Sequence, residues 1–300
     1  MPAVLSSTPS SADLRPMHWQ TTRFRLELSR PLVMGIVNVT PDSFSDGGQH
    51  VAQADGRAHC ERLVAEGADI LDLGGESTRP GAPLVPADEE WRRLQPVLAH
   101  ALTLGVPVSI DTWKPEVMQR ALALGADIIN DVHALETPGA LDAVAAHPSC
   151  GVCLMHMRGV PADMQARTDY RDVVDEVRDY LRGRVAAALA AGLAGERLAL
   201  DPGIGFGKTV EQNFELLQRQ RAFQSLGRPL LVGWSRKSSL GALTGRPVDE
   251  RLAGSVAAAL AAVQQGAQIV RVHDVAATVD ALKVWQAAGL VRPAGALADS

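Results

Sequence analysis

Polar and charged side chains stand at the ends of short apolar runs throughout this chain. In sequence order they include Asn38, Glu76, Arg79, Asp111, Asn130, His156, Asp201, residues 235–238, Arg271 and His273. A single Ser or Asp at such a turn is expected as a helix cap. Amides, carboxylates and cations mixed at eight such ends are hard to explain as caps. The sequence therefore predicts one site at which these groups converge.

One subset of these residues is cationic and rich in hydrogen-bond donors. Arg79 and Arg271 carry planar guanidinium groups that suit phosphate oxygens, and His273 adds to the same wall. Asn38 can offer a carbonyl oxygen to Mg²⁺, which prefers hard oxygen ligands and substrate phosphates. This subset predicts a phosphate site with Asn38 beside a metal ion.

A second subset offers acceptors and an amide. Asp111 and Asp201 are carboxylates, and Asn130 lies between them in the sequence. A carboxylate that accepts two N–H groups suits an aminopyrimidinone edge, as in guanine or a pterin. The two subsets together suggest a ligand that combines a ring with a phosphate.

Lysine usage adds a further clue. The chain has four lysines among 29 Lys and Arg residues, and Lys114, Lys208 and Lys237 fall just past apolar runs. For Lys114, at a helix start, chance is the favoured explanation. Lys237 and Ser238 lie where another helix begins, and serine hydroxyls with backbone N–H groups form a natural carboxylate site there.

Eight apolar runs, each followed by a helical pattern, predict the fold. They cover residues 32–38, 69–73, 106–111, 127–130, 151–156, 197–201, 230–234 and 268–273. This is the count of a closed (β/α)₈ TIM barrel of the α/β class, whose active site lies at the C-terminal strand ends. The runs are nearly continuously apolar, as strands buried on both faces require. A doubly wound sheet is the alternative, although its Gly-x-Gly-x-x-Gly loop does not follow the first run.

No linker divides the chain. We expect residues 1–18 to form a flexible N-terminal tail and residues 19–300 to form a single barrel domain. Residues 21–28 alternate between polar and apolar side chains and predict a short strand that plugs the barrel bottom. Residues 87–104 and 249–265 predict helices by their apolar spacing and polar starts.

Charge and hydropathy exclude several classes of partner. A net charge of −5 argues against nucleic acid as a partner, and the longest apolar runs are too short to span a bilayer.

The Gly-rich residues 203–209 do not form a Walker phosphate-binding loop, because Pro202 stands where that loop needs its first Gly.

Cysteine usage favours a reducing cytoplasm. The three cysteines are Cys60, Cys150 and Cys153, and no secretory signal precedes them. Cys150 and Cys153 form a C-x-x-C pattern, which is typical of a redox pair or of half a zinc site. Packing of Cys153 in a strand is favoured instead, since no second Cys or His pair has zinc-ligand spacing.

Several long motifs give the chain a family resemblance. Residues 34–48, 67–81, 109–112, 128–132, 154–157, 201–209, 235–239 and 271–274 resemble, in order, the motifs of dihydropteroate synthases. The resemblance extends from about residue 31 to residue 288. Corrinoid methyltransferases share the barrel and the pterin pocket, but we do not expect them to carry both Ser-Thr-Arg-Pro-Gly and Ser-Arg-Lys-Ser. A non-catalytic pterin-binding relative is the third possibility, which loss of Asn38, Phe44 or Arg79 would favour; all three are present.

The resemblance implies a reaction and a set of roles. The family joins p-aminobenzoate to 6-hydroxymethyl-7,8-dihydropterin diphosphate and releases diphosphate. By resemblance, the pterin-binding residues are Asp111, Asn130, Met155, Asp201, Phe206 and Lys237, and the diphosphate-binding residues are Asn38 with Mg²⁺, Arg79, Arg271 and His273. The p-aminobenzoate residues are Phe44, Thr78, Pro80 and Ser238. Asn38, Lys237, Arg271 and His273 are implied to be catalytic, and a homodimer through an apolar last helix at 275–290 is implied by analogy.

Overall fold

Eight parallel strands form a closed barrel. The computed structural model describes residues 17–39, 48–77, 83–160 and 163–290. The barrel strands are β3 (Leu32–Asn38), β4 (Ile70–Gly74), β5 (Val108–Asp111), β6 (Ile128–Asp131), β7 (Gly151–Met155), β8 (Leu198–Asp201), β9 (Leu231–Val232) and β10 (Ile269–Val272). The last residue of each strand lies within two residues of the end of the corresponding predicted run.

Strand order decides between the two predicted architectures. The sheet runs β8-β7-β6-β5-β4-β3-β10-β9, with every pair parallel, and a bridge between Leu200 and Leu230 joins its two ends. The first and last barrel strands, β3 and β10, are therefore neighbours, as closure demands. The predicted TIM barrel is confirmed, and the doubly wound sheet is wrong.

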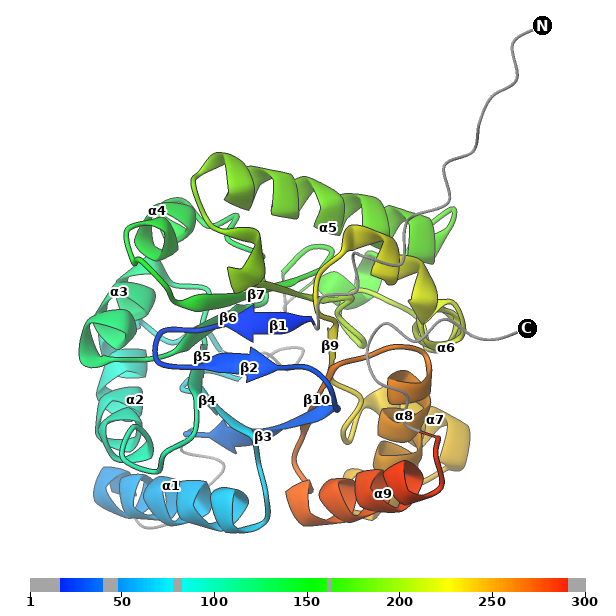
Figure 1. Cartoon of the computed structure of the whole chain (residues 1–300), viewed down its shortest axis with the longest axis horizontal. Helices are drawn as coiled ribbons and strands as arrows, with labels where there is room; N and C mark the ends of the chain where they lie inside the picture. Colours follow the sequence, from blue (N-terminus) through cyan, green and yellow to red (C-terminus); the bar gives the residue numbers. More distant parts are fainter. Residues whose placement is uncertain (1–16, 40–47, 78–82, 161–162, 291–300) are drawn as a thin grey trace, which may run out of the picture.

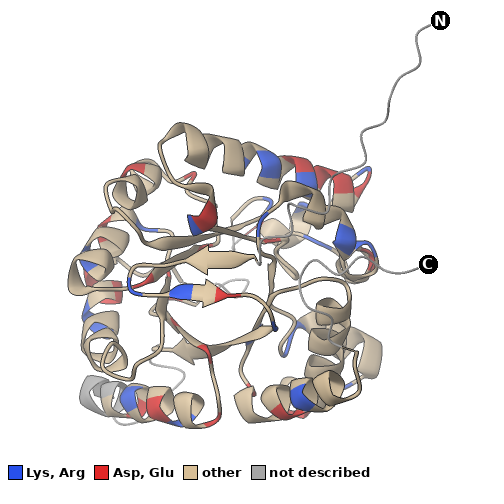
Figure 2. Ribbon diagram, in the orientation of Figure 1, with Lys and Arg blue, Asp and Glu red and all other residues tan. Residues whose placement is uncertain are grey.

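Helices surround the barrel as an outer ring (Figure 1). They are α1 (Gly48–Ala65), α2 (Ala87–Ala101), α3 (Pro115–Leu124), α4 (Ala140–Ala145), α5 (Val173–Ala190), α6 (Val210–Gln218), α7 (Ser238–Thr244), α8 (Leu252–Gln264) and α9 (Val275–Ala287). Local sequence sets several ends: Thr209 and Gln212 form a capping box at α6, and Gly125 ends α3 in the left-handed conformation. Charges of both signs are interspersed on the ring (Figure 2), as on an ordinary solvated surface.

Alternation along the strands separates two apolar layers. Leu71 and Leu73 of β4 face outwards, where they pack with side chains of the helices. Ile70 faces inwards, into a floor formed by Leu32, Met34, Ile70, Ile128, Cys153, Ala199, Leu231 and Ile269, with Trp19 and Leu28 packed against it. Two residues further along, the inward positions become polar, at Asp72, Asn130, Asp201 and Arg271. Because every second strand residue faces inwards, a polar layer lies next to the apolar floor, nearer the C-terminal ends of the strands.

A hairpin closes the N-terminal end of the barrel. Its strands are β1 (His18–Gln20) and β2 (Arg25–Glu27), which pair antiparallel and lie across the barrel mouth in Figure 1. The predicted single strand at 21–28 is therefore only partly right. Thr21 uses its N–H and its hydroxyl to bind the carbonyl of Phe24, at 2.8 and 3.0 Å, and so makes a turn.

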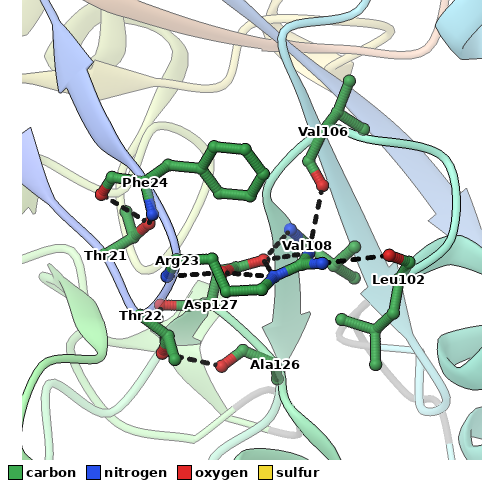
Figure 3. Close-up of polar contacts among 9 residues, drawn as sticks. All are labelled: Thr21, Thr22, Arg23, Phe24, Leu102, Val106, Val108, Ala126 and Asp127. Atoms are coloured by element: carbon green, nitrogen blue, oxygen red, sulfur yellow. Dashed lines mark hydrogen bonds and ion pairs between the residues drawn. The ribbon is translucent and has the colours of Figure 1, made fainter.

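The turn of this hairpin is anchored by an ion pair between Arg23 and the buried carboxylate of Asp127 (Figure 3). Arg23 Nη2 lies 2.7 Å from Asp127 Oδ2, and Arg23 Nη1 donates to the carbonyl of Leu102 at 2.9 Å. Asp127 also accepts from the backbone N–H of Val108 at 2.9 Å. These contacts tie the plug to the start of the barrel strands, away from the C-terminal ends.

Candidate active site

Three of the predicted residues, Arg271, Asp111 and Asn130, lie in one hydrogen-bonded network at the centre of the barrel, together with Asp72. Arg271 Nε donates to Asp72 Oδ2 at 2.6 Å, and Arg271 Nη2 donates to Asp111 Oδ2 at 2.7 Å. Asn130 Nδ2 donates to the same Asp72 oxygen at 3.2 Å. The four side chains come from β10, β4, β5 and β6. The structure therefore brings Asp111, Asn130 and Arg271 together as predicted.

Asp72 was not among the predicted site residues. It is fully buried, with 0% of the residue exposed. Its signal was present in the sequence: a carboxylate enclosed by Leu71 and Leu73 in the apolar run at 69–73, two positions beyond Ile70. Because alternate strand residues share a face, an inward Ile70 implies an inward Asp72.

Burial and neighbouring charges set the ionisation of this centre. Burial raises the pKa of Asp111 to about 7, against the attraction of Arg271 and together with repulsion from Asp72. Burial alone would lower the pKa of Arg271, but the carboxylates of Asp72 and Asp111 raise it above its ordinary value. The guanidinium is therefore a permanent cation between two carboxylates.

Asp201 joins the site from the end of β8 and organises the loop that follows. Its Oδ1 accepts from the N–H of Gly203 at 2.7 Å. Gly203 has a φ of +70°, and a Cβ there would lie 1.8 Å from the carbonyl oxygen of His156, so only glycine fits. Burial raises the pKa of Asp201, while this N–H and the Lys237 ammonium oppose the rise.

The same loop brings Phe206 to Lys237. Lys237 Nζ lies 4.3 Å from the centroid of the Phe206 ring, a cation–π contact. A Cβ on Gly205 would lie 3.2 Å from Lys237 Cδ, so glycine leaves room for the lysine stem. Burial lowers the pKa of Lys237 to about 8, although Asp201 favours the charged form. Ser238 follows as the first residue of α7, with an exposed side chain.

Lys208 holds this loop from within. Its buried Nζ donates to the carbonyls of Gly203 at 2.8 Å and Phe206 at 2.9 Å, and lies 3.0 Å from His156 Nδ1. Burial lowers the pKa of Lys208 to about 7, and that of His156 to about 2. Lys208 thus holds the loop through hydrogen bonds to its carbonyl oxygens.

His273 extends the cationic side of the site as a neutral imidazole. Its Nδ1 lies 3.0 Å from Ser235 Oγ, which also accepts from the backbone N–H of His273 at 3.2 Å. Burial lowers the pKa of His273 to about 3, and the positive charges of Arg271 and Arg236 lower it further. His273 therefore acts at neutral pH through its ring nitrogens and not through a charge.

An apolar wall stands beside the polar centre. Val132, Met155, Met157 and Met164 form a separate buried cluster, against which Trp113 and Phe206 pack. Met155 and Phe206 were both predicted to lie near a ligand ring. The cluster gives a flat aromatic ligand an apolar surface next to Asn130 and Asp201.

Lys114 is not the chance surface cation that the sequence favoured. Its Nζ is buried between Glu76 Oε2 at 2.7 Å and Glu90 Oε2 at 2.5 Å. Trp113 Nε1 donates to the same Glu76 oxygen at 2.8 Å. Helix patterns showed the position of Lys114 but not the two carboxylates, which come from distant parts of the chain.

Asn38 ends β3 beside Asp111. A Cβ on Gly74 would lie 3.9 Å from both Asn38 Oδ1 and Asp111 Oδ2, so both oxygens border the same position. Within the described residues, no group of three or more His, Cys, Asp and Glu side chains is arranged to hold a metal. Of the predicted site residues, Phe44, Thr78, Arg79 and Pro80 lie outside the part of the chain that the structure describes.

Comparison with known proteins agrees with this geometry. Residues 34–273 match the family of pterin binding enzymes. The dihydropteroate synthase of Neisseria meningitidis serogroup B is 54% identical over 278 residues, which cover 91% of this chain and 98% of the relative. The chain belongs to the dihydropteroate synthase family.

Two solved structures of dihydropteroate synthases share the fold and carry ligands. That of Xanthomonas albilineans with 4-aminobenzoic acid has a TM-score of 0.83 and 56% identity, covering 88% of this chain and 95% of that one. That of Burkholderia cenocepacia with 7,8-dihydropteroate has a TM-score of 0.84 and 53% identity, covering 91% and 97%. The prediction of a transferase of the dihydropteroate synthase family is confirmed.

The cysteines follow the packing interpretation. Cys150, just before β7, packs in the outer apolar layer, and Cys153 of β7 packs in the barrel floor, so the two side chains lie in different layers. Burial raises the pKa of both thiols, which disfavours the reactive thiolate.

Among the described helices, none has the length and apolar character needed to cross a bilayer.

Proposed function

We propose that this site performs the dihydropteroate synthase reaction. p-Aminobenzoate attacks the methylene carbon of 6-hydroxymethyl-7,8-dihydropterin diphosphate, giving 7,8-dihydropteroate and diphosphate. The observation that carries the proposal is the closeness of Asp111, Asn130 and Arg271. Carboxylate and amide acceptors for a ring lie within one hydrogen-bonded network with a cation for a phosphate.

The pterin ring lies between the acceptors and the apolar wall. Asp201, Asp111 and Asn130 receive its N–H groups, while Met155 and Phe206 pack near the ring. Lys237, held over Phe206, offers its ammonium to a ring acceptor. Support comes from the burial of Asp201, since a buried carboxylate gains most from hydrogen bonds to N–H donors.

The diphosphate lies on the side of Arg271, His273 and Arg79. Arg271 uses Nε and Nη2 for Asp72 and Asp111, and its Nη1 makes no hydrogen bond within the described chain. An edge with no partner among the described residues suits an anionic oxygen. His273 supplies a neutral donor from Nε2 if Ser235 donates its hydroxyl proton to Nδ1.

The residues present fit a Mg²⁺ ion bound together with the diphosphate. Asn38 would hold it through Oδ1, next to the carboxylate of Asp111, in keeping with a metal that takes few protein oxygens. When bound, the ion adds positive charge that neutralises the leaving diphosphate. No cage of three protein ligands is needed for that role.

In the proposed reaction, departure of the diphosphate precedes attack by the amine. The bond between the methylene carbon and the diphosphate oxygen breaks, and its electron pair leaves with the diphosphate, which Arg271 stabilises. The dihydropterin ring donates electrons to the methylene carbon. The aromatic amine of p-aminobenzoate then forms the new C–N bond and loses a proton to solvent. Since this amine is weakly basic, its lone pair is free, and no strong general base is required.

The p-aminobenzoate carboxylate is assigned to Ser238, with Phe44, Thr78 and Pro80 around the ring. Ser238→Ala is expected to raise the KM for p-aminobenzoate about 5- to 30-fold, roughly 1–2 kcal/mol for a hydrogen bond to a charged group. Pterin binding is expected to stay within a factor of two or so of the original protein, roughly the scatter of an uncoupled site. Steady-state kinetics and calorimetry measure the two quantities.

A neighbouring serine provides the control for this experiment. Ser239 is buried, and its Oγ accepts from Asn213 Nδ2 at 3.0 Å, inside the protein. Ser239→Ala is expected to lower thermal stability and to leave the KM for p-aminobenzoate unchanged. If Ser238→Ala weakens pterin binding instead, Ser238 lines the wrong half of the site.

We also propose a homodimer and a cytoplasmic location. The adjoining helices α7, α8 and α9, with the short turn between α7 and α8, expose large apolar side chains: Leu243 (67% exposed), Val248 in the turn (50%), Leu252 (46%) and Val284 (66%). The three free cysteines fit a reducing compartment. Leu243→Glu is expected to halve the mass seen by analytical ultracentrifugation, whereas Leu189→Glu on α5, 41% exposed, is not. Equal masses for both variants would place the interface elsewhere.

A further inference from the structure

Asp72 contacts two residues, Arg271 and Asn130, which bind different parts of the substrate in the proposed function. Its Oδ2 accepts from Arg271 Nε at 2.6 Å and from Asn130 Nδ2 at 3.2 Å. Arg271 is assigned to the diphosphate and Asn130 to the pterin ring. A single oxygen of a fully buried side chain therefore touches both halves of the first substrate's binding site without facing solvent.

Contact with Asp72 fixes the direction of the Arg271 guanidinium. The guanidinium is planar, so binding at Nε by Asp72 and at Nη2 by Asp111 leaves little freedom to rotate. The remaining nitrogen, Nη1, then points in one direction. Without Asp72, only the contact at Nη2 would restrain the fork.

The same contact fixes the polarity of the Asn130 amide. An amide can turn over and exchange its oxygen with its nitrogen, and its hydrogen-bond partners decide which orientation holds. Because Nδ2 donates to Asp72, Oδ1 is presented away from that carboxylate as an acceptor. A ring N–H group needs an acceptor at this position.

A purely stabilising role explains Asp72 less well. Burying a carboxylate costs several kcal/mol, and buried ion pairs contribute little net stability. The second oxygen, Asp72 Oδ1, accepts no hydrogen bond from the described chain, and neither does Ser109 Oγ, although the two residues are partners across β4 and β5. An ion pair selected for stability would be expected to satisfy these atoms.

We propose that Asp72 is a positioning residue that orients Arg271 and Asn130 together, and so couples diphosphate binding to pterin binding. This inference rests on the proposed function. It differs from that function in its test, because Asp72 touches neither ligand. Its effect must therefore pass through the two residues that do.

The test measures two separate affinities in Asp72→Asn by calorimetry. The probes are 6-hydroxymethylpterin alone, and inorganic diphosphate with Mg²⁺. Both dissociation constants are expected to rise at least tenfold. Asp127→Asn is the matched control, since Asp127 is a buried carboxylate paired with Arg23 at the opposite end of the barrel. That control is expected to lower thermal stability and to leave both affinities unchanged.

A double-mutant cycle with Asn130→Ala separates positioning from a general structural effect. Once the Asn130 amide is gone, Asp72→Asn is expected to weaken the pterin by less than threefold more, while the diphosphate still loses at least tenfold. Full additivity for the pterin, or unchanged affinities in Asp72→Asn, would overturn the proposal. If Asp72→Asn does not fold by circular dichroism, Asp72→Glu replaces it; its displaced carboxylate must weaken both probes. If the original protein binds neither probe, it is the proposed function that fails.

Discussion

Asp201→Ala is expected to abolish detectable pterin binding. The carboxylate is buried, and we assign it two ring N–H groups, so its removal costs about 2–5 kcal/mol, the scale of hydrogen bonds to a charged group. That corresponds to a loss of roughly 30- to 5,000-fold in affinity. Calorimetric titration with 6-hydroxymethylpterin measures it directly.

Two further variants show whether the carboxylate or the loop is responsible. Asp201→Asn can still accept from the Gly203 N–H through its oxygen, but it then turns an N–H₂ group towards the ligand. It is expected to bind pterin as poorly as Asp201→Ala. Asp131→Asn alters another buried carboxylate, which accepts from His133 and Leu135, and is expected to lower stability alone. Unchanged pterin affinity in Asp201→Asn would rule out our placement of this residue.

Lys237 is expected to make the reaction slower at alkaline pH, as an alkaline limb in the plot of kcat/KM against pH. Its pKa is lowered to about 8, chiefly by burial, so the ammonium is present below that pH and lost above it. The kcat/KM for the dihydropterin diphosphate is therefore expected to fall as the pH rises through about 8. Lys237→Met is expected to lower kcat/KM roughly 10- to 150-fold at pH 7, about 1.5–3 kcal/mol for a charged hydrogen bond, and to remove the Lys237 contribution to the limb.

The charge-preserving substitution controls this pH experiment. Arginine stays charged above pH 12, so Lys237→Arg is expected to lose rate through its different shape while also losing the limb near pH 8. The same shift affects stability. Since the folded pKa lies below the ordinary 10.5, the unfolded chain binds more protons between about 8 and 10.5, and the free energy of unfolding rises with pH there. An alkaline limb that persists in Lys237→Met would assign it to another group.

Sequence patterns predicted the barrel well because each strand carries its own signal. Buried parallel strands need continuous apolar runs, and the runs ending at Asn38, Asp111 and Asp201 stop where the strands stop. The hairpin was harder, because Thr21 makes its turn through local hydrogen bonds that alternation in 21–28 does not reveal. Polar strand ends predicted side chains that lie close together, such as Asp111, Asn130 and Arg271, since the barrel topology brings those ends together.

Partnerships between distant residues could not be predicted in the same way. Arg271 and Asp72 lie 199 positions apart, and their contact depends on the closure of the barrel between β3 and β10. The burial of Lys114 between Glu76 and Glu90 depends likewise on three separate elements. Such pairings change pKa values and orientations, and these properties follow only from the assembled fold.

Product formation by the purified protein shows directly whether the protein joins p-aminobenzoate to the dihydropterin. The protein is mixed with 6-hydroxymethyl-7,8-dihydropterin diphosphate and p-aminobenzoate, with Mg²⁺ or with a chelator, and dihydropteroate and diphosphate are both measured. We expect the two products in equal amounts, with Mg²⁺ required and with Asp201→Ala inactive. Absence of dihydropteroate from folded protein that is supplied with both substrates and Mg²⁺ would contradict this expectation.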